Sequence, residues 1–241
     1  MKIKSSEFDR SAPNIKECPN SPFPEFAFIG RSNVGKSSII NLLTERNALA
    51  KVSVTPGKTK LINFFRINGS WNLVDLPGYG FAKVPKGGRA FFQQLVADYM
   101  LQRPNLRRVF VLIDSRHEPQ QIDIEFVTWL AETGRTFDLV FTKADKLKPT
   151  KLEGNIADFL EAIAPSCPDS MRGARMRAST RFALRSANRL AISTRRISAA
   201  PPAQFSVVSL NPAGDPGFQM GCPSCARIFA LCLLLGSSRT L

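Results

Sequence analysis

Hydrophobic residues form two kinds of pattern over the first two thirds of the chain: short continuous runs, and stretches with helical spacing. The short runs are typical of buried strands and lie at 25–29, 61–67, 71–76, 108–114 and 137–142. Apolar residues at helical spacing predict helices at 38–44, 89–102, 122–133 and 150–164. Because strands and helices alternate, the pattern predicts the α/β fold class, with a mostly parallel sheet and helices on both faces.

The connections between these elements carry signals of their own. Asn68-Gly69, between the second and third predicted strands, is a strong hairpin signal. The segments 48–60 and 77–88 are polar or rich in glycine and proline, as loops are. Residues 1–24 contain four prolines, which keep a chain extended, so we expect an N-terminal leader there.

The composition changes after about residue 165. Arg, Ser, Ala, Pro and Cys dominate 165–241, Lys and Glu are absent, and 205–210 is the one stretch that reads as a strand. One interpretation is a low-complexity basic tail, irregular or disordered. We favour a second interpretation, in which a frame change in the coding DNA replaced the native end of the domain. Such a change would remove Lys and Glu and raise Arg, Ser, Pro and Cys together.

The formal charge of +14 favours a polyanionic partner, nucleic acid first. Residues 1–164 hold 23 Lys+Arg against 17 Asp+Glu, a net of +6, whereas 165–241 hold 10 against 2, a net of +8. The charge therefore indicates less about the α/β part than the total suggests.

Several classes of protein are disfavoured. The charged N-terminus has no apolar signal-peptide core, and the longest apolar run, 228–235, is shorter than the about 20 residues of a membrane-spanning helix. Five cysteines, four of them after residue 165, indicate no disulfide framework, and the single histidine, His117, argues against histidine triads and metal clusters. We expect a monomer in the cytoplasm with no membrane partner.

Residues 30–37 fit the phosphate-binding loop pattern Gly-x-x-x-x-Gly-Lys-Ser, the P-loop. Its glycines let backbone N–H groups turn toward phosphate oxygens, and the following helix presents its N-terminus to the anion. Lys36 adds positive charge for the terminal phosphates, and the Ser37 hydroxyl is placed to bind Mg²⁺. A turn that matches by chance would not explain the flanking strand and helix. We predict nucleotide contacts from Gly30, Arg31, Ser32, Asn33, Val34, Gly35, Lys36 and Ser37.

A second motif, Asp75-Leu76-Pro77-Gly78, ends the strand predicted at 71–76. At this place the Asp75 carboxylate can reach Mg²⁺ through water, and the Gly78 N–H can reach a γ-phosphate. Asp-x-x-Gly alone is a common turn. Because this motif follows a P-loop and ends a strand, we predict that its residues contact the phosphates.

The third motif, Thr142-Lys143-Ala144-Asp145, follows the strand at 137–142 and fits the [Asn/Thr]-Lys-x-Asp pattern that reads guanine. The Asp145 carboxylate would accept hydrogen bonds from guanine N1–H and the 2-amino group, which adenine cannot offer. Lys143 would lie along the base plane. The alternative is a polar loop without a ligand. In the company of the other motifs, we interpret this loop as choosing GTP over ATP.

The loop at 48–60 is the expected place for a threonine that contacts Mg²⁺ and the γ-phosphate. Thr55 and Thr59 both lie in it, and spacing alone leaves either open. A loop ordered by γ-phosphate and Mg²⁺ is the usual two-state element of such proteins.

Over about residues 1–164 the chain resembles the EngB (YihA/YsxC) family of bacterial GTPases, in the TrmE-Era-like group. Five stretches carry the resemblance: Gly-Arg-Ser-Asn-Val-Gly-Lys-Ser-Ser (30–38), Thr-Pro-Gly-Lys-Thr (55–59), Leu-Ile-Asn-Phe-Phe (61–65), Val-Asp-Leu-Pro-Gly-Tyr-Gly-Phe-Ala (74–82) and Thr-Lys-Ala-Asp (142–145). Residues 113–119 are also similar to a stretch of that family. The resemblance implies a P-loop NTPase domain of the Ras-like type that binds GTP, GDP and Mg²⁺. It also implies a role in assembly of the large ribosomal subunit, with the subunit or its rRNA–protein precursor as partner, and in cell division and septation.

By the family's pattern the switch threonine is Thr59, which makes Lys36 and Thr59 the expected catalytic residues and Ser37 and Thr59 the expected Mg²⁺ ligands. The residues around it are expected near the nucleotide: Gly57, Lys58, Lys60 and Leu61. Tyr79 stands where Ras-like enzymes carry a water-orienting glutamine, so slow intrinsic hydrolysis is expected. Asn33 then becomes a candidate ligand for potassium.

The end of the domain departs from the family, which closes with a strand, a Ser-Ser/Ala loop that contacts guanine, and a helix. Ser179-Thr180 is the nearest counterpart, but no apolar strand precedes it. We therefore expect a GTPase domain at 25–164 that is incomplete at its C-terminal end. Three hypotheses stay open: a slow GTPase switch, a nucleotide-dependent RNA- or protein-binding module with negligible hydrolysis, and a folding-impaired variant of the family.

Overall fold

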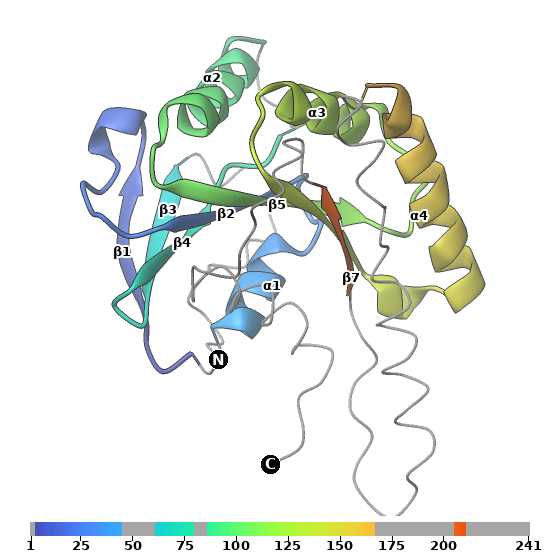
Figure 1. Ribbon diagram of the computed structural model, residues 1–241, viewed down its shortest axis with the longest axis horizontal. Helices are drawn as coiled ribbons and strands as arrows, with labels where there is room; N and C mark the ends of the chain where they lie inside the picture. The colour runs from blue at the N-terminus through green and yellow to red at the C-terminus, as the bar shows by residue number, and fades with distance from the viewer. Residues whose placement is uncertain (1–2, 45–60, 80–85, 167–204, 211–241) are drawn as a thin grey trace, which may run out of the picture.

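The computed structural model describes residues 3–44, 61–79, 86–166 and 205–210 of the 241-residue chain. These residues form one seven-stranded sheet with helices on both faces (Figure 1). The predicted α/β fold class, a P-loop NTPase architecture, is confirmed. Among the described helices, none has the length and apolarity needed to cross a membrane.

The sheet runs in the order β1-β3-β4-β2-β5-β6-β7. Strand β2 is parallel to β4 and β5, and β5 is parallel to β6, whereas the pairs β1–β3, β3–β4 and β6–β7 are antiparallel. The strands are β1 (Ser6–Ala12), β2 (Glu25–Gly30), β3 (Ile62–Ile67), β4 (Trp71–Asp75), β5 (Leu106–Asp114), β6 (Phe137–Thr142) and β7 (Phe205–Leu210).

The helices begin and end close to the predicted positions. The α-helices are α1 (Lys36–Leu43), α2 (Lys86–Gln102), α3 (Gln121–Glu132) and α4 (Pro149–Ile163). Short 3₁₀ helices are η1 (Ile15–Glu17), η2 (Ala144–Lys146) and η3 (Ala164–Ser166). Pro149 is favourable in the first turn of α4 because that position needs no backbone N–H donor.

Two apolar clusters fill the space on the two faces of the sheet. In β5, Val109 and Val111 belong to the cluster beneath α2, α3 and α4, whereas Phe110 and Leu112 belong to the cluster beneath α1. A strand that is covered on both faces has a continuous run of apolar residues, which explains why the sequence located this strand so readily.

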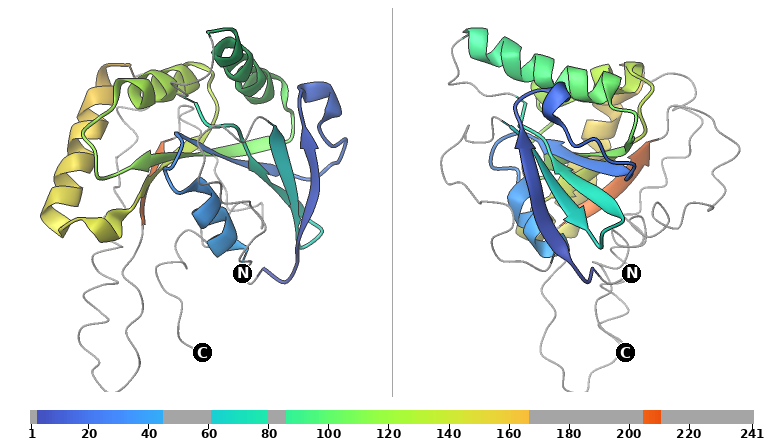
Figure 2. Two further views of the ribbon diagram at one scale, coloured as in Figure 1. Left: turned by 180° about the vertical axis from the view of Figure 1, so that it is seen from behind. Right: turned by 90° about the vertical axis from the view of Figure 1, so that its left-hand side faces the viewer.

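The first residues of the chain differ from the expected leader. Strand β1 lies at the edge of the sheet and pairs with β3 from Ser6↔Ile67 to Ala12↔Ile62, next to the hairpin of β3 and β4 (Figure 2). The sequence of β1 is mostly polar because an edge strand with half-exposed positions needs few apolar side chains. Residues 6–12 are therefore part of the sheet and not of a separate leader.

A buried ionic network ties the start of β2 to the end of α2. Tyr99 Oη donates to Glu25 Oε2 at 2.7 Å, and Arg103 donates to both carboxylate oxygens of Glu25 at 2.9 and 2.6 Å. Arg103 also donates to the carbonyl oxygen of Pro19. Because β2 ends at the P-loop, this network fixes the base of the strand that carries it.

The predicted strand at 205–210 is present as β7, antiparallel to β6. The rest of the predicted tail after η3, including Ser179-Thr180, lies outside the described residues. The expectations of a tail at 165–241 and an incomplete domain at 25–164 stay predictions.

Candidate functional site

The P-loop motif forms the connection between β2 and α1, as predicted from the sequence. Gly30 ends β2, and Lys36 begins α1. Gly35 takes a left-handed conformation with φ +102°, and as the N-cap residue it supplies no side chain to the first-turn N–H groups. No N-cap side chain therefore takes up these N–H groups, and N–H groups at a helix N-terminus can bind phosphate.

The middle of the loop is partly solvent-facing. Ser32 and Asn33 are exposed, Ser37 is half-buried, and Val34 packs into the core beneath α1. Arg31 turns away from this group toward α3, where its Nε lies 3.1 Å from Asp123 Oδ2.

The second motif meets the first through a buried ion pair. The Lys36 ammonium group donates to Asp75 Oδ1, and the two side chains are only 11% and 6% exposed. Asn63 Nδ2 donates to the other carboxylate oxygen of Asp75 at 3.4 Å. Sequence reasoning gave Asn63 no role, although it lies in a stretch that carries the family resemblance.

The backbone of the second motif lies against the P-loop. The Leu76 N–H donates to the Phe28 carbonyl at 3.0 Å, which extends the pairing of β4 with β2. Leu76 and Pro77 are buried. At Gly78 an added Cβ would lie 2.7 Å from the carbonyl oxygen of Gly30, so the two loops touch through a glycine.

This close approach makes Gly78→Ala a sharp test of the loop contact. The methyl group would meet a backbone atom that cannot move aside, so the two loops must separate. We expect the melting temperature to fall by about 4 °C or more and GTP to bind more weakly, because a loss near 2 kcal/mol shifts a domain of this size by a few degrees. Gly154→Ala, at a helical position with open space around it, is the control and should be neutral or stabilising. An unchanged melting temperature for Gly78→Ala would contradict the contact.

The third motif also reaches the P-loop. Thr142 Oγ1 donates to the Val34 carbonyl at 2.7 Å, and Lys143 Nζ donates to the Asn33 carbonyl at 2.6 Å. Ala144 is buried, and half-buried Asp145 lies in η2 with its Oδ2 atom 3.3 Å from Lys146 Nζ. The residues proposed to read the base therefore lie on a loop that is bonded directly to the phosphate loop.

Asp114, at the end of β5, positions Lys143 and was not assigned a role from the sequence. It accepts from Lys143 Nζ at 2.8 Å and from the Arg116 side chain at 3.0 and 2.9 Å. Burial alone would raise the pKa of Asp114, but the hydrogen bonds from Arg116 and Lys143 outweigh it and hold the pKa well below its usual range. The sequence did hold a sign of this role, because Asp114 ends a predicted strand and lies in the stretch 113–119, which resembles the family.

The loop after β5 is fastened in the same way. Ser115 Oγ donates to the Thr142 carbonyl at 2.7 Å, and Asn155 Nδ2 of α4 donates to the Ser115 carbonyl at 2.7 Å. These bonds join α4, β5 and β6 directly beneath the third motif.

The remaining predicted contacts are mostly outside the described part of the chain. Thr55, Gly57, Lys58, Thr59 and Lys60 fall in 45–60, which the structure does not describe. Leu61 is described, and it is 38% exposed immediately before β3. The assignment of the switch threonine stays a prediction.

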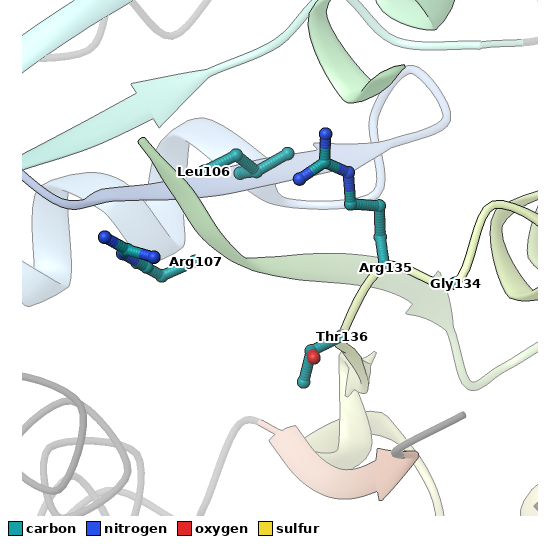
Figure 3. A pocket seen from close by; sticks show the side chains of 5 residues that line it. All are labelled: Leu106, Arg107, Gly134, Arg135 and Thr136. Carbon is teal, nitrogen blue, oxygen red and sulfur yellow. The ribbon is translucent and has the colours of Figure 1, made fainter. Parts of the chain in front are cut away.

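One polar pocket lies at the other end of the sheet. It is formed where β5 begins and where the chain leaves α3 (Figure 3). The residues that line it are Leu106, Arg107, Gly134, Arg135 and Thr136. None belongs to the three motifs, and Arg135 uses its guanidinium group to donate to the Leu101 carbonyl at the end of α2.

Comparison with known proteins agrees with the motifs. A family model described as 50S ribosome-binding GTPase matches residues 25–143. The chain is 57% identical over 166 residues to the "Probable GTP-binding protein EngB" of Christiangramia forsetii, covering 69% of this chain and 84% of that protein. It is 55% identical over 164 residues to the protein of the same name from Bacteroides thetaiotaomicron, covering 68% and 81%. A crystal structure of "a probable GTP-binding protein engB" is similar at 26% identity with a TM-score of 0.49, covering 60% of this chain and 82% of that one.

Proposed function

The chain belongs to the EngB family of bacterial GTPases, and from this premise we propose that it hydrolyses GTP slowly and acts as a GTP-dependent switch. In this proposal the GTP-bound state docks on the large ribosomal subunit or its rRNA–protein precursor in the cytoplasm. The role in normal cell division and septation is part of the same proposal.

The observation that carries the proposal is the convergence of the three motif loops. Asp75 contacts Lys36, and Thr142 and Lys143 contact the carbonyls of Val34 and Asn33. A triphosphate held by the P-loop would therefore have an acidic residue beside its terminal phosphates and a guanine-reading loop beside its base.

In this site the chain's own residues bind and orient the substrate. The P-loop N–H groups and Lys36 hold the phosphates, and Asp145 accepts from the guanine N1–H and 2-amino groups. A water oxygen forms the new bond to the γ-phosphorus in line with the breaking bond to the β–γ bridging oxygen, and GDP and phosphate leave. The nearby Lys36 charge lowers the energy of the charge that develops on the leaving oxygen.

The slow intrinsic rate follows from Tyr79. Its ring is 8% exposed and stacks on Phe126 of α3, with ring centroids 4.2 Å apart and planes 13° apart. A side chain held in this way cannot orient the attacking water, so we propose that the ribosomal partner completes the catalytic site.

The chemistry of the available donors fits Mg²⁺. Ser37 offers a hydroxyl in the first turn of α1, Thr59 is the second proposed ligand, and the Asp75 carboxylate would reach the ion through water. Oxygen donors and few protein ligands suit an ion that is carried in by the phosphates of its nucleotide. Bound Mg²⁺ would neutralise charge on the β- and γ-phosphates. Asn33, with its exposed side chain, is the proposed potassium ligand.

Thermal unfolding with nucleotides tests the binding part of the proposal. A ligand at 100 times its Kd stabilises the folded state by about 2.7 kcal/mol, which raises the melting temperature by roughly 5–10 °C. We expect GTP and GDP with Mg²⁺ to give this increase, and ATP to give less than 1 °C by the same reasoning. Equal increases with ATP and GTP would contradict the reading of guanine, and a chain without a cooperative transition would support the folding-impaired alternative.

Single-turnover hydrolysis separates the switch from a binding module. The reaction is followed in potassium and in sodium, with and without large ribosomal subunits. The proposal expects a slow basal rate that rises with potassium and with the particles. Binding of GTP without turnover under all four conditions would favour the module with negligible hydrolysis.

A further inference from the structure

Asp123 connects the P-loop to α3 without belonging to any of the three motifs. It lies in the first turn of α3 and is almost fully buried, and its Oδ2 atom pairs with Arg31 Nε at 3.1 Å. Arg31 is the second residue of the P-loop. One carboxylate oxygen of Asp123 is thereby used to hold the side chain of a phosphate-loop residue.

The other oxygen of Asp123 has a candidate partner in Tyr79, which directly follows the second motif. Asp123 Oδ1 and Tyr79 Oη are both buried, and neither makes a hydrogen bond of ordinary geometry within the described part of the chain. The stacking of Tyr79 on Phe126, three residues after Asp123 in α3, brings the phenol close to this carboxylate. Burial raises the pKa of Tyr79 well above its usual value, and the negative charge of Asp123 and hydrogen bonding to it raise the pKa further. A phenol O–H and a carboxylate oxygen are a matched donor and acceptor, and leaving both unpaired in the interior costs free energy.

Tyr79 directly follows Gly78, whose backbone lies against Gly30 of the P-loop. The Tyr79 ring is fixed by stacking on Phe126, one turn beyond Asp123 in α3. The place of the Tyr79 side chain on α3 therefore limits where the Gly78 N–H can lie.

We propose that Asp123 is a positioning residue for the γ-phosphate, holding Arg31 with one oxygen and accepting a hydrogen bond from Tyr79 with the other, so that the Gly78 N–H is held where that phosphate would lie. This rests on the proposed GTP-binding function. Because only GTP carries the γ-phosphate that the Gly78 N–H would contact, the bond contributes more to affinity for GTP than to affinity for GDP. Asp123 thereby couples the P-loop, the Asp-x-x-Gly loop and α3.

Two variants isolate the effect. Asp123→Asn keeps the shape of the side chain but has one accepting oxygen in place of two, so it can serve Arg31 or Tyr79 but not both. Tyr79→Phe removes only the hydroxyl and keeps the ring that stacks on Phe126. Asp138→Asn is the matched control, because Asp138 is also a buried aspartate paired with an arginine, Arg108, and lies outside the motif loops.

The readout is the ratio of two dissociation constants, for fluorescent GDP and for a fluorescent non-hydrolysable GTP analogue, measured by titration of the full chain with Mg²⁺. A buried hydrogen bond to a charged group is worth about tenfold in an equilibrium constant. We therefore expect Asp123→Asn to lower the affinity for the GTP analogue, relative to the affinity for GDP, by about tenfold. Tyr79→Phe should weaken it by about threefold to tenfold on the same basis. Asp138→Asn should move both constants together or not at all, and a purely structural role of Asp123 would do the same.

A ratio that stays within twofold of wild type in both site variants would overturn the inference while leaving GTP binding intact. If Asp123→Asn does not fold, Tyr79→Phe decides alone. A wild-type chain that binds neither fluorescent nucleotide would contradict the proposed function itself, which is a separate and recognisable result.

Discussion

Replacing Lys36 with alanine should abolish nucleotide binding, with dissociation constants for GTP and GDP rising by about 100-fold or more. The ammonium group supplies the positive charge for the β- and γ-phosphates in our proposal, and among the described residues no other cation contacts Asp75. Titration with fluorescent GDP measures the loss. Retention of micromolar affinity would contradict the P-loop assignment.

The same substitution should also destabilise the fold, because within the described ranges it leaves the Asp75 carboxylate, 6% exposed, with Asn63 as its remaining side-chain partner. Removing one member of a buried pair typically costs about 3–5 kcal/mol. The double variant with Lys36→Ala and Asp75→Asn removes that buried charge. We expect it to recover thermal stability without recovering affinity, which separates loss of binding from loss of folding. Lys151→Ala, at an exposed position of α4, controls for the loss of a positive charge.

Asp145→Asn should change the preferred base from guanine to xanthine. In our proposal the carboxylate accepts two hydrogen bonds from guanine, whereas an amide offers a donor that suits the 2-carbonyl oxygen of xanthine. A site whose polar groups are left unpaired rejects a base strongly. We therefore expect the affinity for GTP to fall by on the order of 100-fold or more, and xanthosine triphosphate to become the better ligand. Competition of each triphosphate against fluorescent GDP or its xanthosine counterpart gives both affinities.

Asp158→Asn is the matched control, because Asp158 is an exposed aspartate of α4. It should leave both affinities unchanged. If Asp145→Asn bound GTP as tightly as wild type, the third motif would have no part in reading the base. The P-loop and its phosphate contacts would survive that result.

Most of the fold was predictable because local patterns carry it. Strand β5 has both faces covered and so reads as a continuous apolar run, and Asn68 and Gly69, at φ values of +50° and +60°, form the turn that their dipeptide predicts. Strand β1 escaped prediction because its pairing partner, β3, lies at least 50 residues away and its own sequence is polar. An edge strand is defined by its neighbour, and a local window cannot see that neighbour.

Part of the candidate site was likewise predictable from local sequence, and part was not. Residue type and spacing alone identified the P-loop, Asp75-Leu76-Pro77-Gly78 and Thr142-Lys143-Ala144-Asp145, because phosphate and base recognition demand particular groups at short, regular intervals. These loops meet because parallel strands end at one edge of a sheet.

Only the tertiary structure decided which other side chains support them. Asn63, Asp114 and Asp123 act on residues that are 12 to 92 positions away in sequence, through contacts with Asp75, Lys143 and Arg31. Each is an ordinary polar residue in its local context. Their roles arise from burial and from partners that the folded chain brings within hydrogen-bonding distance, and no local pattern records such a distance.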